Sequence, residues 1–342
     1  MRARLEDVCE RGSSNLRQAD VAGRSGDYPI YGASGYIGNV DFYHQELPYV
    51  AIVKDGAGIG RTVLLPAKSS VIGTMQYLLP KKNVLPEYLC YVVRYMHLEK
   101  YFSGATIPHI YFRDYKSEEF NLVPVDYQEE IVATLGKIEA IVAARQQQLQ
   151  KLDDLVKARF IELFGDPELN PRGLPVLPWN AVFLTTTGKL DSNAMVENGR
   201  YPFFTCAKES YKIDSYAFDC EALLLAGNNA AGIYDVKHYK GKFNAYQRTY
   251  VLRLMNEKWS YILFKRQLED KLQYLQSQSK GTNTRYLTLG ILNELRFVVP
   301  PVAEQEQFAA FVEQTDKSKV AVQKALDEAQ LLFDSLMQKY FG

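Results

Sequence analysis

The stretch from Lys237 to Arg253 is the part of the chain best suited to binding a polyanion. It carries five Lys or Arg residues and no acidic residue, and aromatic residues such as Tyr239 and Tyr246 are interleaved with them. Lys and Arg neutralise phosphates, while Arg, Asn and Gln can also bind base edges in the major groove of DNA. We therefore predict nucleic-acid contacts here, with Arg248 as the first candidate. The alternative is a solvated hairpin whose aromatic side chains face the core.

A glycine-rich loop, Asp55–Gly60, looks like a nucleotide-binding loop. Such a loop opens a helix, and a carboxylate for the ribose follows about 20 residues later. Here β-like residues follow and stop at Pro66, and no Asp or Glu occurs between Arg61 and Pro86. We therefore predict a tight turn between two strands, with Lys54 and Arg61 beside it, rather than a cofactor site.

Two further polar loops contain glycine, Ser103–His109 and Ser279–Arg285, and they are equivalent in an internal repeat of the chain. The loop equivalent to Asp55–Gly60 is Ala226–Gly232, which keeps the small residues and loses the charges. Equivalent loops suggest a shared task such as DNA contact. The side chains that we predict to contact DNA are Lys54, Arg61, His109, Arg113, Lys208, Asn228, Asn229, Lys240, Lys242, Arg248, Lys280, Asn283 and Arg285.

Catalytic motifs are missing from the sequence. There is no Gly-x-x-x-x-Gly-Lys-Ser/Thr, no His-Glu-x-x-His and no Gly-x-Ser-x-Gly. The Asn/Asp-Pro-Pro-aromatic loop of adenine methyltransferases is absent too, and the four histidines and four cysteines lack the spacing of metal ligands. We predict a chain without catalytic residues, metal or cofactor.

The elements that must position these residues occur twice. A globular stretch and a long helix ending in Phe164-Gly165 recur as a second globular stretch and a helix ending in Phe341-Gly342, an offset of 177 residues. In the globular parts, Tyr28 matches Tyr201 and Tyr88 matches Tyr261 at an offset of 173. Each copy is long enough to bury its own core, so the pattern indicates duplicated domains rather than a solenoid.

Both predicted long helices carry apolar residues at heptad spacing, which is typical of a coiled coil. Because the first helix leads into the second globular unit and the second helix leaves it, the two must be antiparallel if they pack together. The alternative is a helical hairpin within one core. The residues predicted to form the helix-pair seam or to bind a partner are Ile131, Leu135, Ile138, Val142, Leu149, Leu152, Val156, Phe308, Val312, Val322, Leu326, Phe333 and Leu336.

The predicted fold class is α+β, with two similar mixed α/β domains separated by two long antiparallel helices and an internal pseudo-two-fold repeat. Short β runs broken by Gly and Pro precede one helix in each globular unit, across Pro86–Tyr101 and Trp259–Gln276. The predicted boundaries are residues 1–125 for the first domain, 126–165 for the first helix, 166–178 for a proline-rich linker, 179–299 for the second domain and 300–342 for the second helix.

Charge is distributed unevenly although the net charge is zero. The two globular stretches sum to +6, and the helices with the linker sum to −6. This distribution is compatible with DNA on the globular units and protein on the helices. No apolar run approaches the ~18 residues of a membrane span, and no disulfide framework is indicated, so we expect a cytoplasmic protein without membrane contact.

Four motifs are distinctive in combination: Tyr28–Gly35, Val53–Gly60, Leu163–Pro167 and the ending Phe333–Gly342. With the order globular unit, helix, globular unit, helix, they make the chain resemble the DNA-specificity subunits of type I restriction–modification systems over essentially its whole length. The resemblance implies that each globular unit is a target-recognition domain that reads one half of a split, asymmetric site in double-stranded DNA.

The resemblance also implies partners. The helices of such a subunit set the distance between the half-sites and bind two copies of an adenine methyltransferase subunit, and a motor-nuclease subunit can join the assembly. S-adenosylmethionine would bind in the methyltransferase, so this chain would be non-catalytic. The chain is short for the family, which leaves the recognition subunit of a type IIB system as an alternative. From other classes, the rivals are an S-adenosylmethionine-dependent methyltransferase that uses Asp55–Gly60 and a coiled-coil scaffold whose globular ends bind protein.

Overall fold

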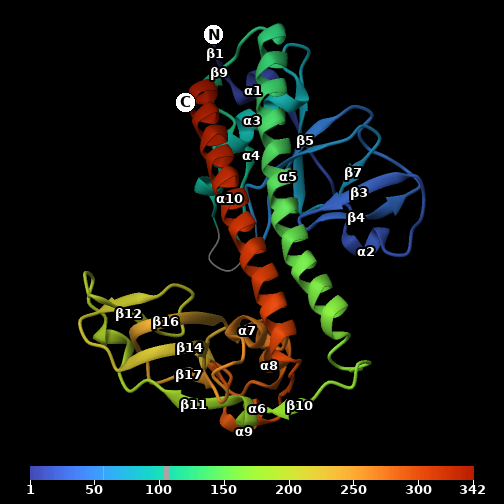
Figure 1. Ribbon diagram of the computed structural model, residues 1–342. Coiled ribbons are helices and arrows are strands. Elements are labelled where there is room, and N and C mark those ends of the chain that lie inside the picture. Colours follow the sequence, from blue (N-terminus) through green and yellow to red (C-terminus); the bar gives the residue numbers. More distant parts are fainter. Residues whose placement is uncertain (57, 104–107) are drawn as a thin grey trace. The chain divides into compact units, whose positions relative to one another are not determined.

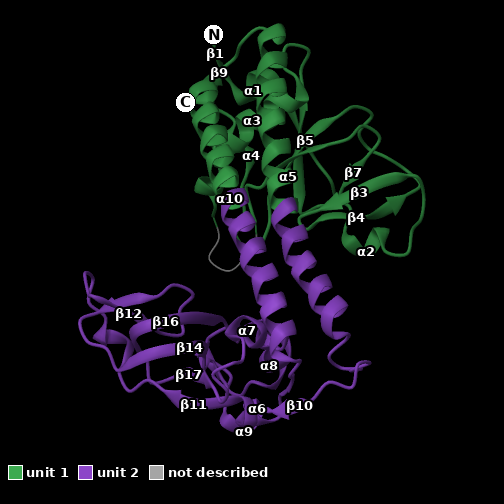
Figure 2. Cartoon of the chain, in the orientation of Figure 1, with its two compact units in different colours: residues 1–147, 323–342 green, residues 148–322 purple. Residues whose placement is uncertain are grey.

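The computed structural model describes residues 1–56, 58–103 and 108–342 (Figure 1). The chain divides into two compact units (Figure 2): unit 1 comprises residues 1–147 and 323–342, and unit 2 comprises residues 148–322. Parts of the loops Asp55–Gly60 and Ser103–His109 therefore lie outside the described residues.

Unit 1 begins with short strands and ends in a long helix. Its elements are β1 (Arg2–Arg4), α1 (Leu5–Val8), β2 (Cys9–Ser13), α2 (Gln18–Val21), β3 (Tyr28–Gly32), β4 (Gly35–Val40), β5 (Tyr49–Val53), β6 (Thr62–Leu65), β7 (Ser70–Val71), β8 (Met75–Pro80), α3 (Pro86–Tyr95), a 3₁₀ turn (Leu98–Tyr101), α4 (Phe112–Tyr115), β9 (Glu119–Asn121) and α5 (Val125–Phe164). The strands form sheets in the orders β2-β8-β5-β6, β4-β3-β7 and β1-β9. The apolar strand β5 is fully buried inside the first sheet, as expected for a run of β-branched and apolar residues.

Unit 2 has β10 (Val176–Pro178), α6 (Trp179–Val182), β11 (Phe183–Thr187), a 3₁₀ turn (Ser192–Ala194), β12 (Tyr201–Phe204), β13 (Tyr211–Ile213), β14 (Phe218–Ala226), β15 (Asn228–Asn229), β16 (Val236–Ala245), β17 (Thr249–Leu254), α7 (Tyr261–Asp270), α8 (Leu272–Gln278), β18 (Arg285–Tyr286), α9 (Leu289–Asn293), β19 (Arg296–Val298) and α10 (Val302–Phe341). Its sheets have the orders β11-β17-β14-β16-β12-β13, β10-β19 and β15-β18. The strand β10 lies within the segment predicted to be a linker, because Val176 to Pro178 pair with Val298 to Arg296.

The two units repeat one topology. The order β2-β8-β5-β6 in unit 1 corresponds to β11-β17-β14-β16 in unit 2, and β1-β9 corresponds to β10-β19. The parallel pair β3 and β7 corresponds to the parallel pair β12 and β16. The ten-residue strand β16 takes the places of both β6 and β7, so the sheet of unit 2 is continuous where that of unit 1 is divided. The predicted fold class, with its internal repeat, is confirmed.

The short helices differ from the prediction in two respects. α3 begins at Pro86 and α7 at Tyr261, an offset of 175, so Tyr88 corresponds to Leu263 and both are fully buried. The match of Tyr88 with Tyr261 is therefore wrong. The helix predicted across Pro86–Tyr101 ends at Tyr95, because His97 adopts a left-handed conformation with φ of 50°. The helix predicted across Trp259–Gln276 is divided into α7 and α8.

The two long helices pack together within each unit. α5 and α10 each have 40 residues, which gives a length of about 60 Å at ~1.5 Å per residue. In unit 1, Ile131 and Leu135 of α5 share a core with Phe333 and Phe341 of α10. In unit 2, Phe160 from the end of α5 shares a core with Phe308 from the start of α10. The start of each helix thus packs against the end of the other, which makes them antiparallel.

Burial along the helices follows the predicted seam except near their ends. Ile131, Leu135, Ile138, Val156, Phe308, Val322 and Phe333 are buried, and Val142, Leu149, Leu152, Val312, Leu326 and Leu336 are partly buried. Near the ends, Phe160 and Phe164 are the buried residues of α5, and Met337 and Phe341 those of α10. A spacing of four residues continues there because the helix packs against a domain core and keeps its natural period of 3.6 rather than 3.5.

Within the described part of the chain, no helix combines the length and the apolar character that crossing a membrane would need.

Candidate nucleic-acid interface

Each unit joins two of its polar loops by the same short backbone pairing. In unit 1, Asp55 after β5 pairs with His109 before α4 as an isolated antiparallel bridge. In unit 2, Asn228 after β14 pairs with Tyr286 before α9 as part of the β15–β18 ladder. The partners correspond in the repeat, at offsets of 173 and 177. The loops that were predicted separately from the sequence therefore lie side by side in both units.

In unit 1, charged and aromatic side chains gather around this pairing. His109 Nδ1 lies 2.6 Å from Asp55 Oδ1, and Lys54 Nζ lies 3.8 Å from Asp55 Oδ2. The guanidinium of Arg113 lies 4.7 Å from the centre of the Tyr111 ring, and 76% of the Arg113 side chain is exposed. This group, Lys54, Asp55, His109, Tyr111 and Arg113, is called cluster 1. It offers exposed cations for phosphates and both donors and acceptors for base edges.

Arg61 has a different position from cluster 1. Its guanidinium donates a hydrogen bond to the backbone carbonyl of Ala33, which lies in the turn between β3 and β4. Arg61 thus connects two of the motifs that carry the resemblance, Tyr28–Gly35 and Val53–Gly60. After the loop comes strand β6 rather than a helix, so the condition for a dinucleotide-binding loop is not met.

In unit 2, the corresponding loops bring together Asn228, Asn229, Lys280 and Arg285, and we call this group, with Arg248, cluster 2. The Lys280 and Tyr286 backbones pair with each other, and the Gly227 backbone N–H donates to the Arg248 carbonyl at 2.8 Å. Arg285 Nη1 donates to the Gln276 carbonyl at 3.1 Å. Backbone contacts thus hold Arg248 beside the loop that contains Asn228.

The two neighbouring asparagines have different surroundings. Asn229 Oδ1 accepts hydrogen bonds from the backbone N–H groups of Ala231 and Ile233, at 2.8 and 3.3 Å, and so stabilises the turn that follows. The partly buried Asn228 side chain makes no hydrogen bond within the described residues. An amide has two donors and an acceptor, so Asn228 is the residue of this pair that can bind a ligand.

Asn283 lies in a turn that depends on glycine. Gly281 has φ of 98°, and a Cβ atom there would come within 2.2 Å of the Thr284 carbonyl oxygen. Only glycine fits this close approach without moving the backbone. The turn holds Asn283 between Lys280 and Arg285, the two basic residues of cluster 2 that flank it in sequence.

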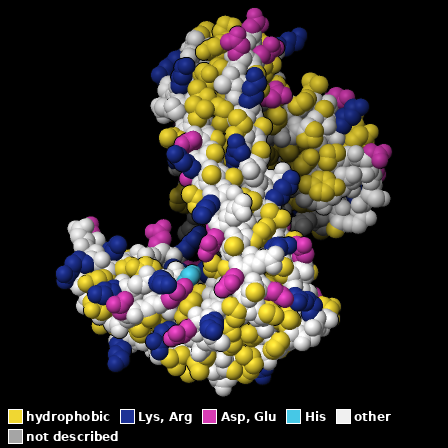
Figure 3. All heavy atoms as spheres, in the orientation of Figure 1, with side chains coloured by type: hydrophobic (Ala, Val, Ile, Leu, Met, Phe, Trp, Pro, Cys, Tyr) yellow, Lys and Arg dark blue, Asp and Glu magenta, His cyan; other side chains and the backbone are white. Residues whose placement is uncertain are grey.

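The basic stretch from Lys237 to Arg253 is divided between several places. Lys240 Nζ forms an ion pair with Glu221 Oε2 at 3.1 Å, and the Lys242 ammonium lies 4.7 Å from the centre of the Tyr216 ring. Lys237 Nζ donates to the carbonyl of Ala207, beside the exposed Lys208. None of these contacts connects Lys240 or Lys242 with cluster 2. On the face drawn in Figure 3, Lys and Arg are frequent over the strands of unit 2, interspersed with acidic residues.

Glu221 is held ionised by its basic neighbours. Burial raises the pKa of its carboxyl group, but hydrogen bonds from Lys240 and His238 lower that pKa by more, so the net shift is downward. The His238 ring also stacks on Tyr261 with ring centres 5.5 Å apart. Glu221 therefore fixes this part of β16 structurally, and Lys240 cannot approach DNA without losing an ion pair.

Within the described residues, no group of three or more His, Cys, Asp or Glu side chains could hold a metal ion. Burial raises the pKa of the Cys9 and Cys90 thiols to about 12, so both are protonated at neutral pH.

Two contacts of cluster 1 were not predicted from the sequence: the Asp55–His109 contact and the stacking of Arg113 on Tyr111. The stacking joins residues two apart in one loop, and the other contact joins residues 54 apart. Spacing along the chain does not reveal either contact, because both depend on how the two loops fold against each other.

Known proteins share this arrangement. The family model for the type I restriction modification DNA specificity domain matches residues 1–153 and 182–329, one stretch in each copy of the repeat. The specificity subunit of the type I restriction enzyme EcoDI from Escherichia coli is 36% identical over 160 residues, which are 44% of this chain and 35% of that protein. The matched part thus spans about a third of that relative's length.

Solved structures agree with the fold. The S subunit of a type I restriction-modification system from M. genitalium has a TM-score of 0.68 at 15% identity, covering 100% of this chain and 96% of that one. A chain from a study of complex assembly and conformational transition in the type I R-M system has a TM-score of 0.51 at 15% identity, covering 99% and 97%. The resemblance inferred from the sequence is confirmed, as is the expectation of a specificity subunit rather than a catalytic one. The chain belongs to the type I restriction–modification DNA-specificity family.

Proposed function

We propose that the chain is the DNA-recognition subunit of a type I restriction–modification complex, and that each unit reads one half of a bipartite, asymmetric target. The observation that carries the proposal is the loop pairing that occurs once in each unit with different side chains. A duplicated scaffold that presents different side chains at equivalent places suits two half-sites of different sequence.

Cluster 1 has the chemistry to bind one half-site. Arg113 can donate two hydrogen bonds to a guanine or neutralise a phosphate, and Lys54 can contact the backbone. Asp55 is an acceptor, which suits the exocyclic amino group of cytosine. The contact with His109 fixes the orientation of the Asp55 carboxylate, so the geometry of recognition is set before DNA binds.

Cluster 2 has the chemistry to bind the other half-site. The amide of Asn228 can donate to N7 and accept from N6 of adenine, the pairing that geometry favours for Asn. Arg248, Lys280 and Arg285 surround it with positive charge. The predicted contacts of Lys208, Lys240 and Lys242 are retained as backbone contacts outside the cluster, and Asn229 as a residue that shapes the loop.

The long helices are proposed to set the gap between the half-sites and to bind two copies of an adenine methyltransferase subunit. Exposed apolar side chains support a partner on these helices: Leu155 of α5 and Leu332 of α10 are equivalent in the repeat, and they are 48% and 51% exposed. A motor-nuclease subunit would complete a restriction complex. S-adenosylmethionine is proposed to bind in the methyltransferase, since this chain shows none of its motifs.

The proposal is tested by mapping methylated adenines in a host genome that expresses the chain with its methyltransferase subunit. The expected result is one motif made of two unlike half-sites separated by an unread gap of constant length. A continuous motif, or methylation that does not change when the chain is deleted, would contradict it.

A further inference from the structure

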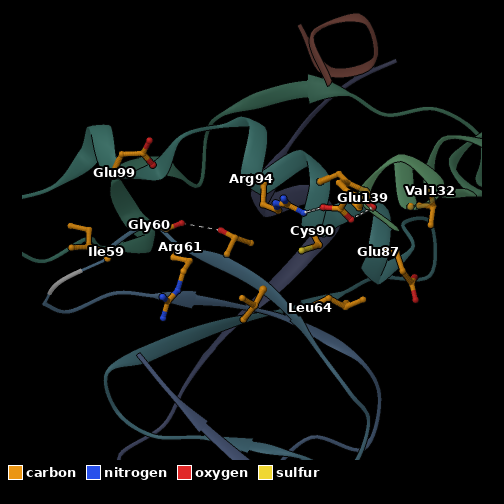
Figure 4. A pocket seen from close by; sticks show the side chains of 15 residues that line it. Ile59, Gly60, Arg61, Leu64, Glu87, Cys90, Arg94, Glu99, Val132 and Glu139 are labelled. Atoms are coloured by element: carbon orange, nitrogen blue, oxygen red, sulfur yellow. Dashed lines mark hydrogen bonds and ion pairs between the residues drawn. The ribbon is translucent and has the colours of Figure 1, made fainter. Parts of the chain in front are cut away.

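Each unit contains a hollow at the same place in the fold. Hollow 1, of about 980 Å³, lies between β6 with its preceding loop, α3 and the first half of α5 (Figure 4). Hollow 2, of about 820 Å³, lies between β16, α7 and the two long helices. Leu64 and Glu139 line hollow 1, and their repeat equivalents His238 and Asp316 line hollow 2. The hollows are therefore two copies of one feature.

Hollow 1 is largely apolar because α5 lacks a side chain at Gly136. A Cβ atom added there would meet only the Tyr91 hydroxyl within 4 Å, at 3.9 Å. Cys90 and Val132 line the hollow close to it in the fold. At one side, Glu139 accepts hydrogen bonds from Tyr91 Oη and Arg94 Nη1, both at 2.6 Å, and Figure 4 shows Arg94 and Glu139 pointing toward each other.

Hollow 2 is lined by charged residues at the same positions. Glu313 stands where hollow 1 has Gly136, and Lys265 stands where hollow 1 has Cys90. Lys265 Nζ forms an ion pair with Glu269 Oε1 at 2.6 Å, and Lys319 Nζ forms ion pairs with Asp153 at 2.6 Å and Asp316 at 3.5 Å. An occupant of hollow 2 meets ion pairs, whereas an occupant of hollow 1 meets apolar surface.

The charges of the two hollows disfavour DNA and favour a basic partner segment. Hollow 1 is lined by Glu87, Glu99 and Glu139, and its Arg94 is already paired with Glu139. Hollow 2 holds five acidic residues against four Lys or Arg residues. A phosphate backbone would be repelled by these carboxylates, and Lys or Arg side chains on a protein would be attracted by them.

We propose that two copies of the methyltransferase subunit insert the same segment, an apolar side chain flanked by Lys or Arg, into the two hollows, and that they bind unequally. This inference rests on the proposed function. In hollow 1 the apolar side chain is buried, so binding persists in concentrated salt. In hollow 2 the basic flank binds to carboxylates that are already paired, so binding is weaker and is lost as salt screens the charges. The two subunits therefore join stepwise, at hollow 1 first.

The test measures how many methyltransferase subunits the full chain binds as the salt concentration rises. Chain and methyltransferase from one host are purified together and analysed by light scattering and native mass spectrometry. We expect two subunits per chain at low salt and one at about 1 M salt, where the Debye length is about 3 Å. Release of both subunits over the same salt range would overturn the inference and leave the proposed function intact. A chain that binds no methyltransferase at low salt would overturn both.

Matched variants assign the tight site. Gly136→Leu fills hollow 1, and we expect it to weaken the salt-resistant subunit by about tenfold or more, the scale of one excluded apolar side chain. Gly136→Ala gives a similar gain in helix propensity and leaves the hollow open, so it should retain both subunits. Glu313→Leu at the equivalent position should retain the salt-resistant subunit. Equal behaviour of Gly136→Leu and Gly136→Ala, or loss of the salt-resistant subunit in Glu313→Leu, would contradict the assignment.

Discussion

Gln128 and Gln305, 177 residues apart, make equivalent hydrogen bonds in the two units. Gln128 Oε1 accepts from the Leu85 backbone N–H at 2.9 Å, and its Nε2 donates to the Val123 carbonyl at 2.8 Å. Gln305 Oε1 accepts from the Ser260 N–H at 2.9 Å, and its Nε2 donates to the Pro300 carbonyl at 2.8 Å. Both side chains are fully buried. Each glutamine thus fastens the start of a long helix to the start of the short helix of its own domain.

Loss of either glutamine should destabilise its own unit. Gln305→Ala leaves a backbone N–H and a carbonyl without partners, which costs about 1–3 kcal/mol for each buried group. Both tryptophans, Trp179 and Trp259, lie in unit 2, so urea unfolding followed by tryptophan fluorescence reports on that unit. We expect Gln305→Ala to lower the fluorescence midpoint more than Gln128→Ala does. An equal shift from both variants would show that the two units unfold as one.

Asn228 and Asn229 should have separable roles. Asn228→Ala should keep the stability of unit 2 and lose discrimination of one base, by about 1–3 kcal/mol, because its amide is free to bind DNA. Asn229→Ala should lower stability, because two backbone N–H groups lose their acceptor. Thermal unfolding and selection of targets from a randomised DNA library measure the two effects. Lower stability in Asn228→Ala with unchanged stability in Asn229→Ala would contradict these roles.

Arg248 is predicted to contact DNA, and Lys242 provides the matched control. If Arg248 binds a guanine edge, Arg248→Ala should cost about 1–3 kcal/mol and relax one position of one half-site. If it binds phosphate, affinity should fall evenly for all sequences and the dependence on salt should become shallower. Lys242 lies over Tyr216 and outside cluster 2, so Lys242→Ala should have a smaller effect. Unchanged affinity in Arg248→Ala at moderate salt would favour the solvated hairpin instead.

The Glu221 carboxyl group should make unit 2 sensitive to acid. Its pKa is lowered in the folded chain, so its contribution is present above the ordinary value of 4.5 and is lost as the pH falls through the folded pKa. Glu221→Gln should therefore destabilise unit 2 at pH 7, and the difference from the unmodified chain should shrink below about pH 4.5. Tryptophan-detected unfolding at several pH values measures this. A difference that is constant with pH would exclude the ion pair as its cause.

Much of this fold can be predicted from the sequence because the repeat and the apolar periodicity are strong local signals. The long helices lie where the apolar spacing and the flanking Pro301 and Gly165 placed them, and β5 and β17 have their predicted bounds. The seam near the helix ends differs because contact with the domain core, rather than with the partner helix, selects Phe160 and Phe164. The Asp55–His109 contact joins two distant loops through tertiary packing, so no local pattern could reveal it.

The paired helices should determine the gap between the half-sites. Removing one heptad from each helix at matched positions, Val142–Gln148 and Lys319–Ala325, keeps the seam in phase and shortens the helix pair by about 10 Å at ~1.5 Å per residue. At ~3.4 Å per base pair this corresponds to roughly three pairs. We expect the preferred gap to shorten by about two to four pairs, or binding to weaken because about a quarter turn of rotation is also lost. An unchanged gap at full affinity would show that the helices do not set it.

The central claim is that each unit reads its own half-site, and target selection with one variant in each cluster tests it most directly. Arg113→Ala alters cluster 1 and Asn228→Ala alters cluster 2, and each variant is purified with the methyltransferase subunit and exposed to a library randomised in both half-sites. We predict that the two variants relax positions in opposite halves and leave the other half unchanged. Relaxation in the same half by both variants, or in both halves by either one, would contradict the claim.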